Sequence, residues 1–186
     1  MGLEWKKLLI TGIAQIDIAW ENSKENMKKI EAFVKKASQS NVELVLFPEM
    51  SLTGFTMDIN KLLLSEEQII NWIKPLAIDN NISIGLGFAI KVDEKGKNKY
   101  TIVSNKGDIL AMYTKIHPFS YSGEDEKYYK GDEFVIKAAN NNKQNLYVKQ
   151  FRLNGKPCKE TRIPFSKIVS GGLLEVEMQD TPVDRY

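Results

Sequence analysis

Residues 42–55 read V-E-L-V-L-F-P-E-M-S-L-T-G-F, and the architecture can be worked out from here. Residues 42–47 form a short, almost continuous apolar run, which is typical of a strand buried between two layers. Pro48 lacks the N–H that a central strand needs, so it ends the strand. Glu49 follows at once, at the kind of strand end where α/β proteins assemble their sites, so its carboxylate is a candidate general base. A surface acid at a strand end is the plainer alternative.

Helix and strand patterns alternate on both sides of this run. Apolar residues with a 3.6-residue period predict an amphipathic helix over 23–37, with Ser23 as its N-cap. Ser65 with Gln68 three residues later predicts a capping box at the start of a second helix, which ends at Asn80-Asn81. Strands are predicted over 8–16, 42–47, 82–90, 99–104 and 109–113, with a polar hairpin turn over 93–97. The order β-α-β-α-β-β-β predicts a layered α/β fold.

The pattern changes near residue 134. Beyond it, strands are predicted over 146–153 and 173–178, with Asn154-Gly155 as a type I′ turn, and 165–169 reads as one helical turn. No long amphipathic helix is predicted in this segment. The sequence is therefore divided into an α/β domain over 1–133 and a mainly β tail over 134–186.

Composition limits the function classes. The chain has 186 residues with 26 basic and 24 acidic side chains, a net charge of +2 that gives no drive toward nucleic acid or a membrane surface. No apolar run suits a membrane span or a signal peptide, so a cytoplasmic protein is expected. Its single cysteine, Cys158, cannot form an intramolecular disulfide. There is no Cys/His cluster, P-loop or G-x-G-x-x-G motif, so neither a metal nor a cofactor is expected.

A second candidate residue, Lys115, follows the strand predicted over 109–113. A lysine at a strand end can stabilise an oxyanion, although a solvated surface charge is the more common reading. Five motifs then occur together in one order: I-A-Q-I-D-I-A-W-E-N-S-K-E-N, F-P-E-M-S-L-T-G-F, I-S-I-G-L-G-F-A, Y-T-K-I-H-P-F and G-E-D-E-K-Y-Y-K-G. With them, residues 8–133 resemble the front half of the nitrilase, or carbon–nitrogen hydrolase, superfamily near its ω-amidase-like branch.

This resemblance implies an α-β-β-α sandwich, of which the chain would hold a part, and hydrolysis of a small amide by a Glu-Lys-Cys mechanism. It implies that Glu49 is the base, that Lys115 stabilises the oxyanion and that Glu124 is a second glutamate of the site. In such a mechanism a thiolate attacks the amide carbon while a carboxylate moves protons and a cation stabilises the developing charge. The three residues are predicted to meet around Lys115, within roughly 3–5 Å of one another.

The expected nucleophile departs from the family pattern. Family members place it on an elbow after a buried strand, whereas Cys158 follows the turn Asn154-Gly155-Lys156-Pro157. An exposed hairpin thiol has little activation, so weak or absent amidase activity is expected. The alternative is a non-catalytic folded remnant or interaction module.

Residues 134–182 resemble the C-terminal tail of glycoside hydrolase family 92, the α-mannosidases. The motifs F-V-I-K-A-A-N-N-N, N-L-Y-V-K-Q-F-R-L-N-G-K-P and I-V-S-G-G-L-L-E-V-E-M-Q-D-T-P carry this resemblance, and none of that family's catalytic residues has a counterpart here. A carbohydrate-related module is therefore a third reading. Because half a sandwich would leave the apolar strands over 42–47 and 82–90 uncovered, self-association is also expected.

Overall fold

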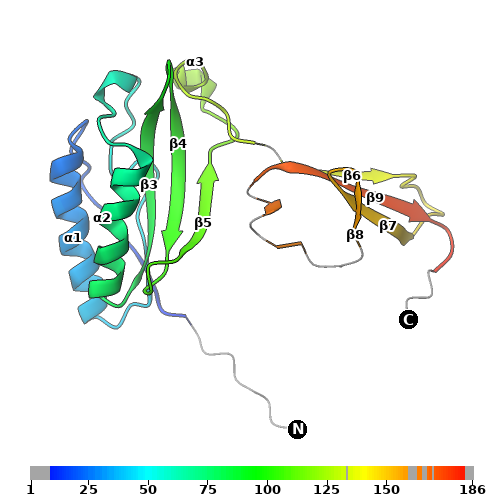
Figure 1. The fold of residues 1–186 in the computed structure, drawn as a ribbon, viewed down its shortest axis with the longest axis horizontal. Coiled ribbons are helices and arrows are strands. Elements are labelled where there is room, and N and C mark those ends of the chain that lie inside the picture. The colour runs from blue at the N-terminus through cyan, green and yellow to red at the C-terminus, as the bar shows by residue number, and fades with distance from the viewer. Residues whose placement is uncertain (1–8, 133, 159–162, 165–166, 169, 183–186) are drawn as a thin grey trace, which may run out of the picture. The chain divides into compact units, whose positions relative to one another are not determined.

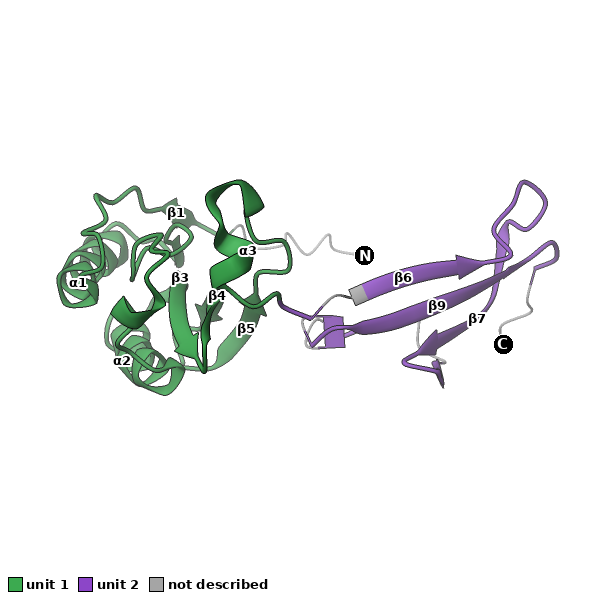
Figure 2. Ribbon diagram, turned by 90° about the horizontal axis from the view of Figure 1, so that it is seen from above, with its two compact units in different colours: residues 1–130 green, residues 131–186 purple. Residues whose placement is uncertain are grey.

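The computed structural model describes residues 9–182 except 133, 159–162, 165–166 and 169. The chain forms two compact units, unit 1 over 1–130 and unit 2 over 131–186 (Figures 1 and 2). The fold is mixed α/β: both long helices belong to unit 1, and each unit has its own sheet.

A five-stranded sheet in the order β1-β2-β3-β4-β5 forms the centre of unit 1. The first three strands are parallel, and β3, β4 and β5 are antiparallel. Helical crossovers join the parallel strands and tight turns join the antiparallel ones, as backbone geometry requires. The predicted order of elements is confirmed, although the first two strands are shorter than predicted. The strands are β1 (Thr11–Ile13), β2 (Leu44–Leu46), β3 (Ser83–Val92), β4 (Lys95–Val103) and β5 (Ile109–Thr114).

Two helices cover one face of this sheet, α1 (Ser23–Gln39) and α2 (Glu66–Asp79) (Figure 1). The capping box of α2 is present as predicted, with Ser65 and Gln68 each bonding the other's backbone. The predicted N-cap of α1 is wrong by one residue: Asn22 caps it by accepting a hydrogen bond from the Glu25 amide. The apolar stripes of both helices pack on one side of β3 in a single core that includes Ile30, Val34, Ile69, Ile73, Ile84, Leu86 and Phe88.

The prediction of uncovered apolar faces is wrong for residues 82–90, because every residue of β3 from Ile84 to Ile90 is buried. For the strand over 42–47 the outcome is mixed, because in β2 Val45 is buried and Leu44 and Leu46 are partly exposed. Ile82, Ile84, Leu86 and Phe88 are inaccessible to solvent. On the side away from the helices, the loop after β2 folds back across the strand. This loop passes so close that a Cβ at Gly87 would lie 2.4 Å from the Pro48 carbonyl oxygen.

A second, smaller core lies under that loop, formed by Met50, Leu62, Ala89 and Tyr128. Tyr128 follows two short helical turns, η2 (Ser120–Ser122) and α3 (Glu124–Lys127). The two turns meet at Gly123, which is in the left-handed region at φ 76°. A third short turn, η1 (Ile59–Lys61), leads toward α2. The loops at this end of the sheet are therefore packed against it.

Unit 2 is a four-stranded sheet in the order β6-β9-β7-β8. Its outer pair β6–β9 is parallel, and the other pairs are antiparallel. Asn154 and Gly155 both have positive φ, 51° and 76°, as the predicted type I′ turn requires. The predicted helical turn over 165–169 lies mostly outside the described residues. The strands are β6 (Phe134–Ala139), β7 (Tyr147–Leu153), β8 (Lys156–Cys158) and β9 (Gly172–Gln179).

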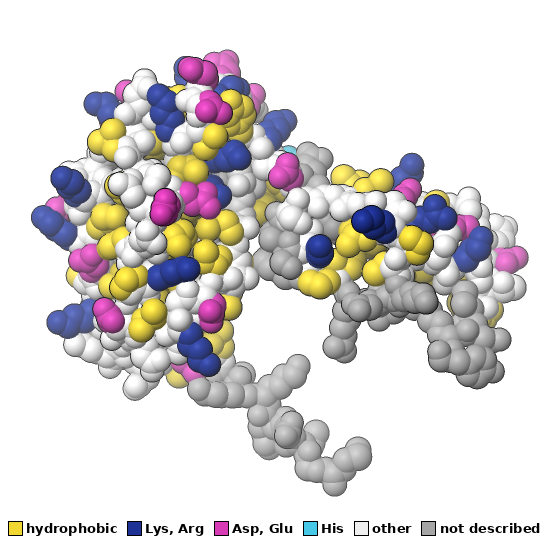
Figure 3. Space-filling view, viewed as in Figure 1, with side chains coloured by type: hydrophobic (Ala, Val, Ile, Leu, Met, Phe, Trp, Pro, Cys, Tyr) yellow, Lys and Arg dark blue, Asp and Glu magenta, His cyan; other side chains and the backbone are white. Residues whose placement is uncertain are grey.

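On the face drawn in Figure 3, described side chains of both charges are interspersed with hydrophobic ones over unit 1. Among the described residues, no helix combines the length and the apolar character needed to cross a membrane.

Candidate active site

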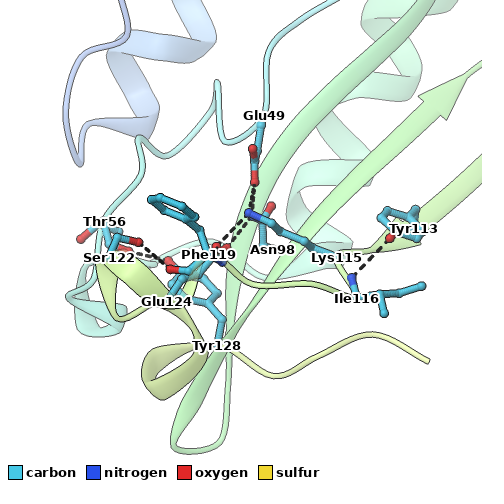
Figure 4. A network of polar contacts seen from close by, with 10 residues as sticks. All are labelled: Glu49, Thr56, Asn98, Tyr113, Lys115, Ile116, Phe119, Ser122, Glu124 and Tyr128. Atoms are coloured by element: carbon cyan, nitrogen blue, oxygen red, sulfur yellow. Dashed lines mark hydrogen bonds and ion pairs between the residues drawn. The ribbon is translucent and has the colours of Figure 1, made fainter. Parts of the chain in front are cut away.

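Lys115 lies at the centre of a charged cluster at one end of the unit 1 sheet. It follows β5 directly, and its backbone N–H donates to the Asn98 carbonyl at 2.8 Å, which extends the β4–β5 ladder by one bond. Its ammonium nitrogen, Nζ, lies 2.8 Å from Glu49 Oε1 and 2.8 Å from Glu124 Oε2 (Figure 4). The three residues predicted from the sequence are therefore in direct contact.

Glu49 is presented by the loop that crosses β3. Backbone bonds from Phe47 to Gly85 (2.8 Å) and from Leu52 to Gly87 (3.2 Å) attach both ends of this loop to the strand. The Glu49 side chain is 52% exposed. Its Oε1 accepts from Lys115 and, at 2.6 Å, from the Asn98 amide group, while its Oε2 accepts no hydrogen bond from any described residue. Glu49 therefore has one restrained oxygen and one that is open.

Glu124, at the start of α3, is the opposite kind of carboxylate, because its side chain is wholly buried. Its Oε2 accepts from Lys115 and from the Phe119 backbone amide (2.6 Å), and its Oε1 accepts from Asn98 (2.9 Å). Burial alone would raise the pKa of Glu124, but hydrogen bonds from Lys115, the Phe119 amide and Asn98 lower it below the usual value. Glu124 is thus a fixed anion that anchors Lys115.

The environment keeps Lys115 charged. Partial burial alone would lower its pKa, but the hydrogen bonds and negative charges of Glu124 and Glu49 raise it above the usual value. The ammonium also lies 5.4 Å from the ring centroid of Phe55, a cation–π contact on the side of the Glu49 loop. A cation kept in place beside an open carboxylate is suited to stabilising an oxyanion.

Two residues of this cluster were not selected from the sequence. Asn98, only 4% exposed, bonds both carboxylates. Tyr128 is 1% exposed and donates to the Thr56 carbonyl at 2.6 Å. Burial, together with the negative charge of Glu124, raises the pKa of Tyr128 well above its usual value. The sequence analysis placed Asn98 between a turn over 93–97 and a strand over 99–104, so it offered no signal for this residue, which lies within β4.

Cys158 lies in unit 2, at the end of the three-residue strand β8, where it pairs across the ladder with Phe151. A hairpin turn precedes it, as predicted, but its side chain is partly buried and not exposed as expected. Residues 159–162, where a nucleophile elbow would follow, lie outside the described residues. Within the described part of the chain there is no group of three or more His, Cys, Asp or Glu side chains that could hold a metal ion.

Similar proteins include two curated amidases. The chain is 27% identical over 121 residues to Omega-amidase YafV of Yersinia enterocolitica, a match that covers 65% of this chain and 46% of that protein. It is 28% identical over 113 residues to 2-oxoglutaramate amidase of Bacillus subtilis, covering 59% and 43% respectively. The chain therefore spans about half the length of the curated relatives that it matches.

Solved structures agree on the fold. An amidase from Nesterenkonia sp. superposes with a TM-score of 0.59 at 19% identity, covering 72% of this chain and 52% of that one. A carbon–nitrogen hydrolase from Helicobacter pylori G27 gives a TM-score of 0.60 at 16% identity, covering 69% and 47%. At these identities the likeness is one of fold.

The sequence profile described as Carbon-nitrogen hydrolase matches residues 10–168. The match continues beyond unit 1 into unit 2. The resemblance of residues 134–182 to a glycosidase tail stays a prediction. Because the match covers well over half of the sequence and includes Glu49, Lys115, Glu124 and Cys158, the chain belongs to the carbon–nitrogen hydrolase family.

Proposed function

We propose that unit 1 carries the acid–base and oxyanion-stabilising half of an amidase site, whose substrate is a small amide. The observation that carries this proposal is the position of the Lys115 ammonium, 2.8 Å from both the buried Glu124 and the half-exposed Glu49. The names of the relatives, an omega-amidase and a 2-oxoglutaramate amidase, support an ω-amide as substrate.

The open oxygen of Glu49 suits the role of general base. It takes the proton of the attacking thiol as sulfur bonds to the amide carbon, and Lys115 stabilises the oxyanion that forms. Glu49 then returns the proton to the nitrogen, ammonia leaves as the C–N bond breaks, and water hydrolyses the thioester. Glu124, which already accepts three hydrogen bonds, acts by holding Lys115 rather than by moving protons.

The nucleophile would have to come from unit 2. Cys158 is the chain's single cysteine, and it lies on a short hairpin strand of unit 2. We therefore expect this chain to hydrolyse amides weakly or not at all. A non-catalytic remnant or interaction module is the alternative, and it predicts no turnover under any condition.

Ammonia release from small ω-amides tests both readings, using the full chain, Cys158→Ser and Glu49→Gln. Slow turnover that disappears in both variants would support the proposal. Turnover that survives in Cys158→Ser would exclude Cys158 as the nucleophile, and turnover that survives in Glu49→Gln would exclude Glu49 as the base. Intact-mass measurement adds a second readout: we expect no stoichiometric acyl adduct on Cys158, and such an adduct would show that our rejection of an efficient nucleophile is wrong.

We also propose that the chain self-associates through the outer strand β5. Its side chains Ile109 and Leu110 are 43% and 58% exposed, on a strand that ends the sheet of unit 1. Exposed apolar edge strands template pairing with another chain. Light scattering at several concentrations tests this, and a monomer that persists at all of them would contradict it.

A further inference from the structure

Asn98, on β4, connects all three charged residues of the site. Its side-chain nitrogen, Nδ2, lies 2.6 Å from Glu49 Oε1 and 2.9 Å from Glu124 Oε1. Its backbone carbonyl accepts the Lys115 N–H at 2.8 Å. Figure 4 shows the side chain of Asn98 beside the Lys115 ammonium, with Glu49 on one side and Glu124 on the other.

The chemistry of an amide group suits this place. A carboxamide nitrogen carries two hydrogens, so one Asn98 side chain can donate to two carboxylates at once. If the amide group were flipped, its carbonyl oxygen would face two carboxylate oxygens, and none of these atoms could donate a hydrogen bond. The orientation with Nδ2 toward the carboxylates is therefore the one that fits. Asn98 is neutral, so it satisfies both anions without adding a second positive charge to compete with Lys115.

The two donors on Glu49 converge on the same atom. Lys115 and Asn98 both bond Oε1, and Oε2 accepts no hydrogen bond from the described residues. Lys115 alone could swing with a flexible side chain, whereas Asn98 is buried in a strand and supplies a fixed direction. The orientation of the Glu49 carboxylate therefore depends on a residue outside the expected catalytic set.

We propose that Asn98 is a positioning residue of this site: it holds the Glu49 carboxylate by Oε1 and so leaves Oε2 as the oxygen that takes the proton. The role given to Oε2 rests on the proposed amidase function. The claim that Asn98 holds the Glu49 carboxylate does not rest on that function, and it can be measured in a chain that turns over no substrate.

The test uses the full chain and two variants. Asn98→Leu keeps the size of the side chain and removes both donors, and Thr101→Val is the matched control. Thr101 is also buried on β4 and donates one hydrogen bond, to the Ala111 carbonyl, away from the charged cluster. Carbon-detected NMR follows the carboxyl titration of Glu124 and the order parameter of the Glu49 side chain.

In Asn98→Leu we expect the pKa of Glu124 to rise by about one unit, because a hydrogen bond to its charged form is lost. We expect the Glu49 order parameter to fall in the same variant, and both readouts to stay unchanged in Thr101→Val. Unchanged values in a folded Asn98→Leu chain would overturn the proposal. If turnover is detectable, kcat should fall while KM changes little.

The wild-type chain provides a further measurement if Asn98→Leu does not fold. The two side-chain amide protons of Asn98 should exchange slowly with solvent, and their chemical shifts should follow the titration of Glu124. Rapid exchange with no response to that titration would refute the double contact. A wild-type chain that turns over no amide would count against the proposed function alone, because these NMR readouts would still decide the role of Asn98.

Discussion

Replacing Lys115 with methionine should reveal how strongly the buried carboxylate depends on it. The variant leaves Glu124, with no exposed side-chain surface, facing Glu49 without the cation between them. Removing one partner of a buried ion pair costs about 3–5 kcal/mol. Glu124 keeps two donors, Asn98 and the Phe119 amide, so we expect the lower end, about 3 kcal/mol of unfolding free energy at pH 7.

The loss of unfolding free energy in Lys115→Met should be smaller in acid, and the direction of this pH dependence follows from the pKa of Glu124. In the wild type this pKa is below the ordinary 4.5, so Glu124 contributes stability above pH 4.5 that is lost as the pH falls through the folded-state pKa. In Lys115→Met the hydrogen bond and the positive charge of Lys115 no longer lower the pKa of Glu124, so this pKa rises relative to the wild type and the variant loses most stability where Glu124 is ionised. The difference between the two proteins is therefore larger at pH 7 than near pH 4.5.

Urea unfolding followed by tryptophan fluorescence measures this difference. The three tryptophans, Trp5, Trp20 and Trp72, all lie within residues 1–130, so the signal reports unit 1 alone. Lys99→Met is the matched control, because the partner of Lys99, Glu66, is 38% exposed and water can solvate it again. The control should lose about 1 kcal/mol or less. A loss below about 1 kcal/mol in Lys115→Met at pH 7, or an equal loss at both pH values, would refute the reasoning.

Three further substitutions and one control, Gly12→Ala, test the scaffold by the same unfolding measurement. Gly87→Ala should cost about 2–3 kcal/mol, because its Cβ would lie 2.4 Å from the Pro48 carbonyl oxygen. Gly12→Ala should cost less, because its Cβ would meet only the Val42 side chain, at 3.2 Å, and no backbone atom. Equal losses at the two glycines would contradict the close approach of the Glu49 loop. Ser65→Ala removes the side-chain cap of α2 and should cost about 1 kcal/mol; no change would mean that the capping box is not formed in solution. Tyr128→Phe leaves the buried Thr56 carbonyl without its donor and should cost about 1–2 kcal/mol, and a neutral result would place water at that carbonyl.

Local sequence patterns predicted the helices well but did not predict the packing of segments that are distant in the sequence. The apolar period that predicted a helix over 23–37 is a property of neighbouring turns, and α1 spans Ser23–Gln39. The return of the Pro48–Gly54 loop across β3 joins segments more than 30 residues apart, so no local period records it. The one local indication of this loop crossing was the pair of glycines Gly85 and Gly87, because glycine in a strand often marks the close approach of another backbone.

The candidate site shows the same division. Glu49, Lys115 and Glu124 were selected by motifs that resemble a family, since a single acid or lysine at a strand end is ambiguous. Asn98 was missed because residues 93–97 were assigned to a turn and the strand was expected to begin at Lys99, whereas β4 begins at Lys95. This part of β4 is polar because it carries a site residue on one face and, on the other, Lys99, which pairs with Glu66 of α2. The polar residues that made this part of β4 look like a turn therefore belong to the site and to the contact with α2.

The position of the closing residues in the chain sets an order of events during synthesis. Glu124 and Tyr128 are the last buried side chains of unit 1, and their bonds reach back to Asn98 and Thr56, 26 and 72 residues earlier. A growing chain cannot complete the charged cluster until residue 128 has left the ribosome. Residues 131–186 take roughly 3 to 11 s to make at about 5–20 residues per second, whereas small α/β domains fold in milliseconds to seconds. Unit 1 can thus enclose its buried anion before the strands of unit 2 exist to compete for its open sheet edges.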